Sequence, residues 1–193
     1  LNQPILKTFA ALLLLWATGF TIEAGDWPQW RGPDRSDVST ETGLLRQWPD
    51  EGPRREWLFE NAGMGYAGFS IADGTLFTMG TRDEQAILLA LDARTGRELW
   101  ATPIGKIFVE ERGDGPRGTP TVDGDRVYAL GGQGTLIGVK AKDGAPLWRV
   151  TMQELGGKVP TWGYAESVLV DGNQVICTPG GDQGAVVALN KID

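Results

Sequence analysis

The feature that most constrains this chain is a repeat with a period of 48 to 50 residues. Three segments share the same order of turn residues and apolar runs, and they begin at Gly68, Gly118 and Glu166. An Asp-Gly pair recurs at positions 73, 123 and 171, and two of the tryptophans, at positions 100 and 148, show the same spacing. A fixed period of this length is typical of solenoids and propellers, in which each repeat is one supersecondary unit.

Within each repeat the pattern predicts four short antiparallel strands. The first ends at the Asp-Gly pair, a strong signal for a two-residue hairpin turn because both central residues need a positive φ angle. The turn glycines are Gly74, Gly124 and Gly172. In the second repeat, "RVYAL" and "TLIGVK" predict two more strands, and "AKDG" closes a turn into "PLWRV". Helical solenoids would show apolar residues at 3.6-residue spacing, which is absent. The sequence therefore predicts an all-β fold, a β-propeller of four-stranded antiparallel blades.

A tryptophan occupies matching positions in the outermost predicted strands, at Trp57, Trp100 and Trp148. A flat ring at this position can be buried against the neighbouring blade and can help to set the angle between blades. We interpret these rings, together with the turn glycines, as structural anchors of the repeat.

These residues resemble the quinoprotein-like (PQQ-like) β-propeller repeat. The segment "LALDARTGRELW" from Leu89 to Trp100 reproduces its pattern of Ala-Leu-Asp, Thr-Gly and Leu-Trp, "GVKAKDGAPLW" approximates it, and "VALNKID" begins a third copy. The opening "DWPQWRGPDRSDVS" from Asp26 is similar to the start of a group of exported bacterial proteins with this propeller. The resemblance implies a closed ring of roughly seven or eight blades. We therefore expect this chain, with about three blades, to be an incomplete ring and the N-terminal portion of such a protein.

We expect the chain to divide into three parts. Residues 1–24 are predicted to be a cleaved signal peptide, because Lys7 precedes an apolar run and a cleavage site follows at Ala24, and an uncleaved anchor is the alternative. Residues 25–52 form an N-terminal extension. Residues 53–193 hold the repeats, with an outer strand near 53–60, blades at 66–102 and 117–151, and a partial blade at 163–193. We expect export to the periplasm or beyond, with no transmembrane span in the mature chain, since a span takes about 20 apolar residues.

Charge and composition exclude several kinds of function. The 18 basic and 25 acidic residues give a net charge of -7, which repels a phosphate backbone and makes nucleic acid a poor partner. Histidine is absent, so these residues cannot form a Ser-His-Asp triad or a His-ligated zinc site. The single cysteine, Cys177, cannot form an intrachain disulfide, and we interpret it as a small buried side chain in a strand.

Candidate binding residues lie in the loops that precede the first strand of each blade, because a propeller gathers these loops on one face. The segment "TWGYAES" combines two aromatic rings with a carboxylate and a hydroxyl, which could bind a planar ligand or a peptide, although rim packing is the alternative. The predicted binding residues are Arg117, Thr161, Trp162, Tyr164 and Glu166, with Tyr66 and Thr119 in equivalent loops.

Two functions remain open from the sequence. We favour a non-catalytic scaffold of the cell envelope that binds a protein or a ligand at this loop face, with no cofactor, metal or catalytic residue. Its parallel is the scaffold component of the outer-membrane β-barrel assembly machinery, and fold analogy alone does not establish function. The alternative is a pyrroloquinoline-quinone-dependent dehydrogenase of alcohols or sugars, which the resemblance implies would use Ca2+ and an aspartate base. Other blades would have to complete that site, and the adjacent cysteines common in such enzymes are absent here.

Overall fold

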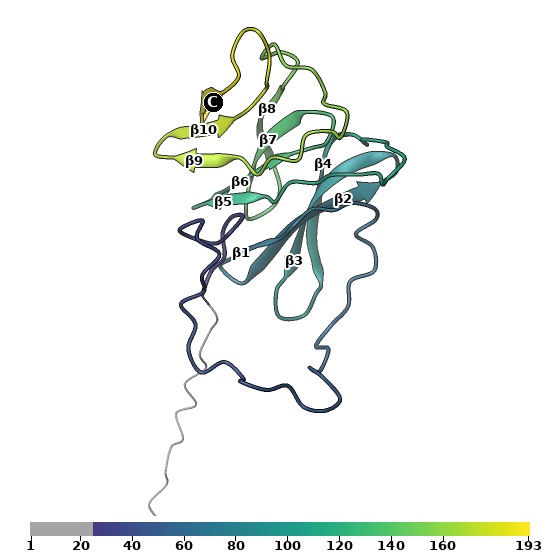
Figure 1. Ribbon diagram of the computed structural model, residues 1–193, viewed down its shortest axis with the longest axis vertical. Coiled ribbons are helices and arrows are strands. Elements are labelled where there is room, and N and C mark those ends of the chain that lie inside the picture. The colour runs from purple at the N-terminus through teal and green to yellow at the C-terminus, as the bar shows by residue number, and fades with distance from the viewer. Residues whose placement is uncertain (1–24) are drawn as a thin grey trace, which may run out of the picture.

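The computed structural model describes residues 25–193, and the predicted signal peptide at 1–24 lies outside them. The described chain forms three antiparallel sheets and contains no helix. Figure 1 shows the sheets one above another, with the first sheet nearest the N-terminal segment and the third nearest the C-terminus. The all-β prediction is confirmed, and over the described residues the sheets form an open stack of propeller blades.

Each sheet is built from strands in chain order, as in a propeller blade. The first sheet consists of β1 (Ser70–Ala72), β2 (Thr75–Arg82), β3 (Gln85–Asp92) and β4 (Glu98–Lys106). The second consists of β5 (Thr121–Asp123), β6 (Arg126–Leu130), β7 (Thr135–Lys140) and β8 (Pro146–Thr151). The third has three strands among the described residues, β9 (Leu169–Asp171), β10 (Gln174–Cys177) and β11 (Val187–Asn190).

Alternation along the strands divides the apolar core between two interfaces. In β6, Val127 and Ala129 belong to the cluster between the first and second sheets, whereas Tyr128 and Leu130 belong to the cluster between the second and third. This follows from the two-residue period of a strand, which points successive side chains to opposite faces. Cys177 is fully buried in the second cluster, as the sequence predicts.

The first hairpin turn agrees with its prediction. Asp73 and Gly74 are the two central residues between β1 and β2, and both have positive φ angles, of 48° and 69°. This is the φ pattern of a type I′ turn, in which both central positions require φ above zero.

The other two hairpin turns are shifted by one residue from the prediction. Asp123 pairs with Arg126 across the second turn, so the two central residues are 124–125, and in the third turn they are 172–173. Only the glycine of each has a positive φ angle, 55° and 54°, which is the pattern of a type II′ turn. The aspartate ends the strand instead of entering the turn, so Ala72 of the first blade occupies the place of Asp123 in the second.

Each of the tryptophan anchors bonds to the sheet that follows it in the chain. The acceptor is always the carbonyl of the residue directly after the third strand of that sheet. These bonds run from Nε1 of Trp57, Trp100 and Trp148 to the carbonyl oxygens of Ala93, Ala141 and Lys191, over 3.1, 3.0 and 3.1 Å. The rings of Trp100 and Trp148 therefore connect consecutive blades, and Trp57 makes the same contact with the first sheet.

Residues 53–60 pair with no strand among the described residues, so the outer strand expected there stays a prediction. Trp57 within this segment still contacts the first sheet as the later tryptophans contact theirs.

The N-terminal extension contacts all three sheets beside their first strands. Residues 27–28 form backbone hydrogen bonds with Ile71 of β1 and with Val122 of β5. Arg35 donates from Nη2 to the carbonyl of Val168, directly before β9, over 2.8 Å. The extension therefore bonds to β1, to β5 and to the residue before β9, and these three strands lie side by side across the stack.

Candidate functional site

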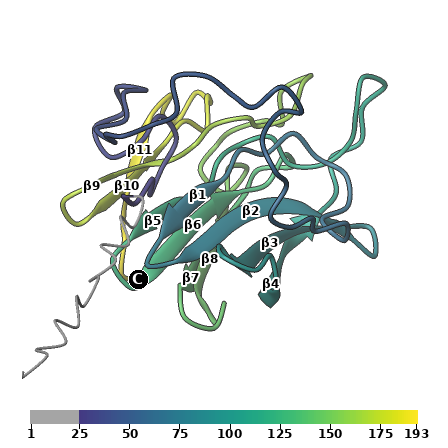
Figure 2. The same ribbon diagram turned by 90° about the horizontal axis from the view of Figure 1, so that it is seen from below.

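The connections that precede β1, β5 and β9 gather on one face of the stack, which we call the loop face, along the upper side of the view in Figure 2. They surround an open cavity of about 550 Å³. This volume lies within the range of roughly 300 to 1,000 Å³ that is typical of ligand pockets. Its lining side chains include Trp30, Arg35, Tyr66, Arg117, Thr119 and Glu166.

Two of the five predicted binding residues, Arg117 and Glu166, line this first cavity. Thr161 and Tyr164 line a second open cavity of about 570 Å³, together with residues 178–180. Glu166 lines both cavities and therefore lies at the boundary between them. The structure thus places four of the predicted residues around two adjoining cavities.

Trp162, the fifth predicted residue, lines neither of these cavities and is exposed beside the second. Half of its surface is accessible, at 50%. The guanidinium carbon of Arg112 lies 4.2 Å from the centroid of its ring, which is a cation–π distance. Trp162 therefore presents a large aromatic surface whose orientation is supported by a cation.

Arg117 stabilises the shape of the loop face. Its Nη1 and Nη2 atoms donate to the carbonyls of Gly115 and Gly113, both over 2.6 Å. Its guanidinium carbon also lies 4.8 Å from the ring centroid of Phe108 and 5.7 Å from that of Tyr66. Because the charge is bonded to loop carbonyls, Arg117 positions the rim and the Tyr66 ring.

Glu166 is held in place by the backbone and the side chain of Thr178. The Thr178 amide and hydroxyl donate to Oε2 over 2.9 and 2.6 Å. Burial lowers the pKa of Arg35 on the other side of the first cavity, and the charge of Glu166 acts in the opposite direction. The carboxylate therefore fixes a loop and also offsets part of the cost of burying a cation.

Tyr164 points into the protein. It is 4% exposed, and its hydroxyl oxygen lies 3.0 Å from the carbonyl oxygens of both Lys158 and Pro179, which share its one proton. Burial is the main reason that the pKa of Tyr164 is raised. The ring of Tyr164 therefore packs beneath the second cavity, and only Trp162 of the two aromatic residues in "TWGYAES" offers an exposed face.

The N-terminal extension contributes two residues that the sequence analysis did not single out, Trp30 and Arg35. Trp30 is 50% exposed at the cavity, and Arg35 donates from Nε to the Gln29 side chain over 2.9 Å. Arg35 lies 133 residues from Val168, to which it bonds, so no local pattern could have placed it there. The only signal available was the density of Trp, Arg and Pro between 27 and 35.

Residues 25–193 contain no group of three or more His, Cys, Asp and Glu side chains that could hold a metal ion. Over the same range, the structure contains no helix of the length and apolar character needed to cross a membrane.

Comparison with known proteins identifies the repeat. The family model for the outer membrane protein assembly factor BamB matches residues 38–193. No curated protein matches the chain. Among solved structures, the chain is similar to a quinohemoprotein alcohol dehydrogenase from Comamonas testosteroni, at 19% identity and a TM-score of 0.55 over 86% of this chain and 25% of that one. A europium-containing methanol dehydrogenase matches at 17% identity and a TM-score of 0.57, over 80% of this chain and 27% of that one.

BamB from Moraxella catarrhalis is also similar, at 23% identity and a TM-score of 0.45 over 63% of this chain and 33% of that one. The chain therefore spans between a quarter and a third of the length of these three structures. At such identities the likeness to the two dehydrogenases shows the fold alone, which hosts different functions. Because the family model covers most of the described residues, the chain belongs to the family of the outer membrane protein assembly factor BamB, a β-propeller family built from PQQ-like repeats.

Proposed function

We propose that this protein is a non-catalytic scaffold of the cell envelope that binds a protein partner at the loop face. The observation that carries the proposal is the exposure of three aromatic side chains on that face. Trp30, Tyr66 and Trp162 are 50%, 63% and 50% exposed. Tryptophan and tyrosine dominate many protein interfaces, because a large rigid ring buries much area and loses little conformational entropy.

The polar side chains of the loop face support this function by holding the rim rigid. Arg117 bonds to two loop carbonyls, and Glu166 bonds twice to Thr178. A rim that is already ordered loses little freedom when a partner binds, which favours affinity. The gain in binding energy should therefore come mainly from the exposed rings.

Export to the periplasm forms part of the same proposal. It is supported by the signal-peptide pattern of residues 1–24 and by the family description, which names an outer membrane assembly factor. A net charge of -7 disfavours binding to anionic membrane surfaces, which is compatible with binding to a protein partner instead.

A quinone-dependent dehydrogenase is the alternative, and the residues at the loop face fit it poorly. Such a site would need several oxygen ligands for Ca2+ and an aspartate base. The carboxylate at the cavity, Glu166, is bonded to Thr178, and the chain from 25 to 193 has no cluster of three potential metal-ligating side chains. We therefore favour the scaffold.

Site-specific crosslinking in the cells of origin tests the proposal. A photoreactive residue at position 30 or 66 of the full chain should give a discrete adduct with an envelope protein. The matched control is position 149, where Arg149 is exposed in the outer strand β8, away from both ends of the stack. Equal labelling from position 149, or no adduct from positions 30 and 66, would contradict the proposal.

A further inference from the structure

The end of the stack opposite the loop face carries the turns between the first and second strands of each sheet and those between the third and fourth strands. We call this end the turn face. An open cavity of about 270 Å³ lies there between the first and second sheets. Its floor is apolar and includes Ala72, Phe77 and Val122, none of which is more than 8% exposed. Two carboxylates, those of Asp73 and Asp125, stand among its lining residues.

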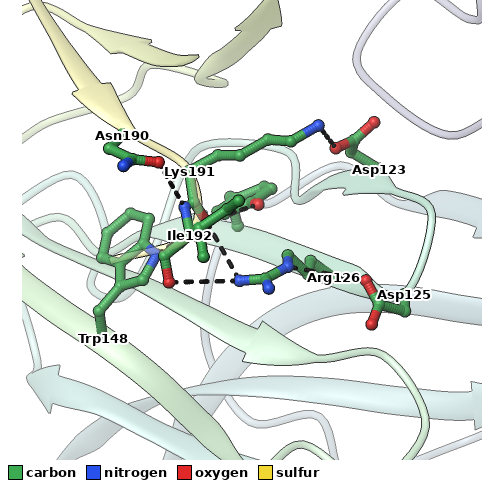
Figure 3. Close-up of polar contacts among 8 residues, drawn as sticks. Asp123, Asp125, Arg126, Trp148, Asn190, Lys191 and Ile192 are labelled. Atoms are coloured by element: carbon green, nitrogen blue, oxygen red, sulfur yellow. Dashed lines mark hydrogen bonds and ion pairs between the residues drawn. The ribbon is translucent and has the colours of Figure 1, made fainter. Parts of the chain in front are cut away.

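The next interface shows what fills the equivalent place. Between the second and third sheets, Lys191 Nζ forms an ion pair with Asp123 Oδ2 over 2.7 Å (Figure 3). Arg126 Nη1 donates to the carbonyls of Lys191 and Ile192, over 3.3 and 3.4 Å. The Tyr128 hydroxyl donates to the same Lys191 carbonyl over 3.1 Å. Two basic side chains therefore cover the turn face of this interface.

The corresponding positions between the first and second sheets carry small or apolar residues. The strand register matches the two hairpins, because Ala72 pairs with Thr75 as Asp123 pairs with Arg126. Ala141 and Lys191 correspond, because each carbonyl accepts the indole hydrogen bond. The first interface therefore has Ala72 where the second has Asp123, and Thr75 where the second has Arg126. It likewise has Phe77 in place of Tyr128 and Ala141 in place of Lys191. The cavity corresponds to the space that basic side chains occupy one blade later.

We propose that this cavity binds an alkylammonium group, either that of a small amine or that of a lysine side chain. The alkyl stem would lie on Phe77 and Val122, as lysine stems commonly lie along apolar surface. The ammonium group would pair with Asp73 and with Asp125, whose Oδ1 lies 3.6 Å from Arg126 Nε in an exposed ion pair. The volume is just below the roughly 300 Å³ at which pockets for drug-sized ligands begin, so it suits a small group.

The carbonyl of Ala141, which lines the cavity, supports this ligand chemistry. The Lys191 carbonyl accepts three hydrogen bonds, from Trp148, Tyr128 and Arg126. Among the described residues the equivalent carbonyl of Ala141 accepts one, from Trp100. A carbonyl oxygen has two lone pairs, so Ala141 can accept a further hydrogen bond from a ligand N–H.

Lys142 also lines the cavity and limits its affinity. Its side chain is exposed and forms no ion pair with any residue in the described part of the chain. The Lys142 ammonium repels a second ammonium group bound in the cavity, so removing it should strengthen binding.

Titration with n-butylammonium, a lysine side chain without its backbone, tests the proposal on the full chain. We expect saturable binding by calorimetry, and none for n-butanol, which has the same stem without the charge. The double variant Asp73→Asn/Asp125→Asn should bind about tenfold more weakly, and Lys142→Ala should bind more tightly. Equal binding of the amine and the alcohol, or unchanged affinity in the Asn variant, would overturn the proposal.

A second pair of variants uses the internal comparison. Ala72→Asp/Ala141→Lys copies the filled interface and should abolish n-butylammonium binding. Lys191→Ala should open a second cavity beside Asp123, and n-butylammonium should raise its melting temperature more than that of the unaltered protein. Absence of both effects would contradict the assignment. Nα-acetyl-lysine N-methylamide distinguishes the two sources: affinity equal to that of n-butylammonium identifies a protein lysine, and much weaker affinity identifies a small amine.

Discussion

Trp100 and Ala141 join the first two sheets through a single hydrogen bond, in which the indole Nε1 donates to the carbonyl oxygen over 3.0 Å. The same ring packs beside Phe77, with 5.8 Å between the centroids. It also lies over Gly144, where an added Cβ would be 2.5 Å from a ring atom. One side chain thus combines a polar bond, an aromatic contact and close approach to a turn.

The glycine beneath the ring should be sensitive to any side chain. Gly144 has a φ angle of 70°, which is unfavourable for alanine. The methyl group of an alanine there would also clash with the Trp100 ring. We expect Gly144→Ala to lower the free energy of unfolding by about 2 to 4 kcal/mol. Gly74→Ala is the control, since Gly74 has a φ angle of 69° and no atom within 4 Å of an added Cβ. Urea unfolding should show a loss of about 1 kcal/mol for the control, and equal losses would contradict the packing role.

The indole hydrogen bond and the ring can be separated by substitution. Trp100→Phe removes the donor and keeps an aromatic ring, so we expect a loss of about 1 kcal/mol. Trp100→Ala also removes the packing against Phe77, and the loss should be roughly 3 to 5 kcal/mol. Both values come from denaturant titration of the full chain. A phenylalanine variant as unstable as the alanine variant would show that the hydrogen bond, and not the ring, dominates.

Stability should decline in alkaline solution. Burial raises the pKa of the Cys177 thiol to about 11 from 9.0, and that of Tyr128 to about 12 from 10.0. For each group, at a pH between its ordinary pKa and its raised pKa, the unfolded chain has lost a proton that the folded chain retains. The free energy of unfolding therefore falls as the pH rises from 9 to 12. Unfolding titrations at several pH values should show this decline.

Two variants test how much of the loss of stability at high pH comes from Tyr128 and how much from Cys177. Tyr128→Phe should flatten the curve above pH 10, and Cys177→Ala should flatten it between pH 9 and 11. A decline of unchanged slope in both variants would place its origin in other groups.

The N-terminal extension should protect the first strands of the sheets. Arg35→Ala removes the bond to the Val168 carbonyl, and we expect a loss of about 1 to 3 kcal/mol, since the acceptor is partly buried. The amides of Ile71 and Val122, which bond to residues 27–28, should then exchange hydrogen faster. The Leu89 amide in the centre of the first sheet serves as the control. Unchanged exchange at Ile71 and Val122 would show that the extension is held without Arg35.

The repeat made the blades predictable, because glycine turns, alternating strands and an outer tryptophan recur as local signals. The position of the turns was less certain for a physical reason. Asp-Gly can fill both central positions, as at Asp73, or the aspartate can end the strand when Gly-Asp or Gly-Asn supplies the turn, as at residues 124–125 and 172–173. Both arrangements contain the same dipeptide, and only the pairing across the strands distinguishes them.

The loop face was predictable as a location and less so in its composition. Chain order alone brings the loops before β1, β5 and β9 together, which places Arg117 and Glu166 at one cavity. Tyr164 is buried and Trp162 is exposed, and this difference depends on the turn between them. A sequence with two nearby aromatic residues does not show which ring faces inward. Arg35 reaches the site across 133 residues, a contact that no local pattern contains.

The scaffold proposal is tested most directly by titrating pyrroloquinoline quinone together with Ca2+ into the complete purified protein, with all of its blades, by calorimetry, and an unrelated planar acid serves as the control. A non-catalytic scaffold should give no saturable heat and no shift in melting temperature with either compound. Saturable binding of the quinone at micromolar affinity or tighter, without binding of the control acid, would contradict the proposal and favour a dehydrogenase.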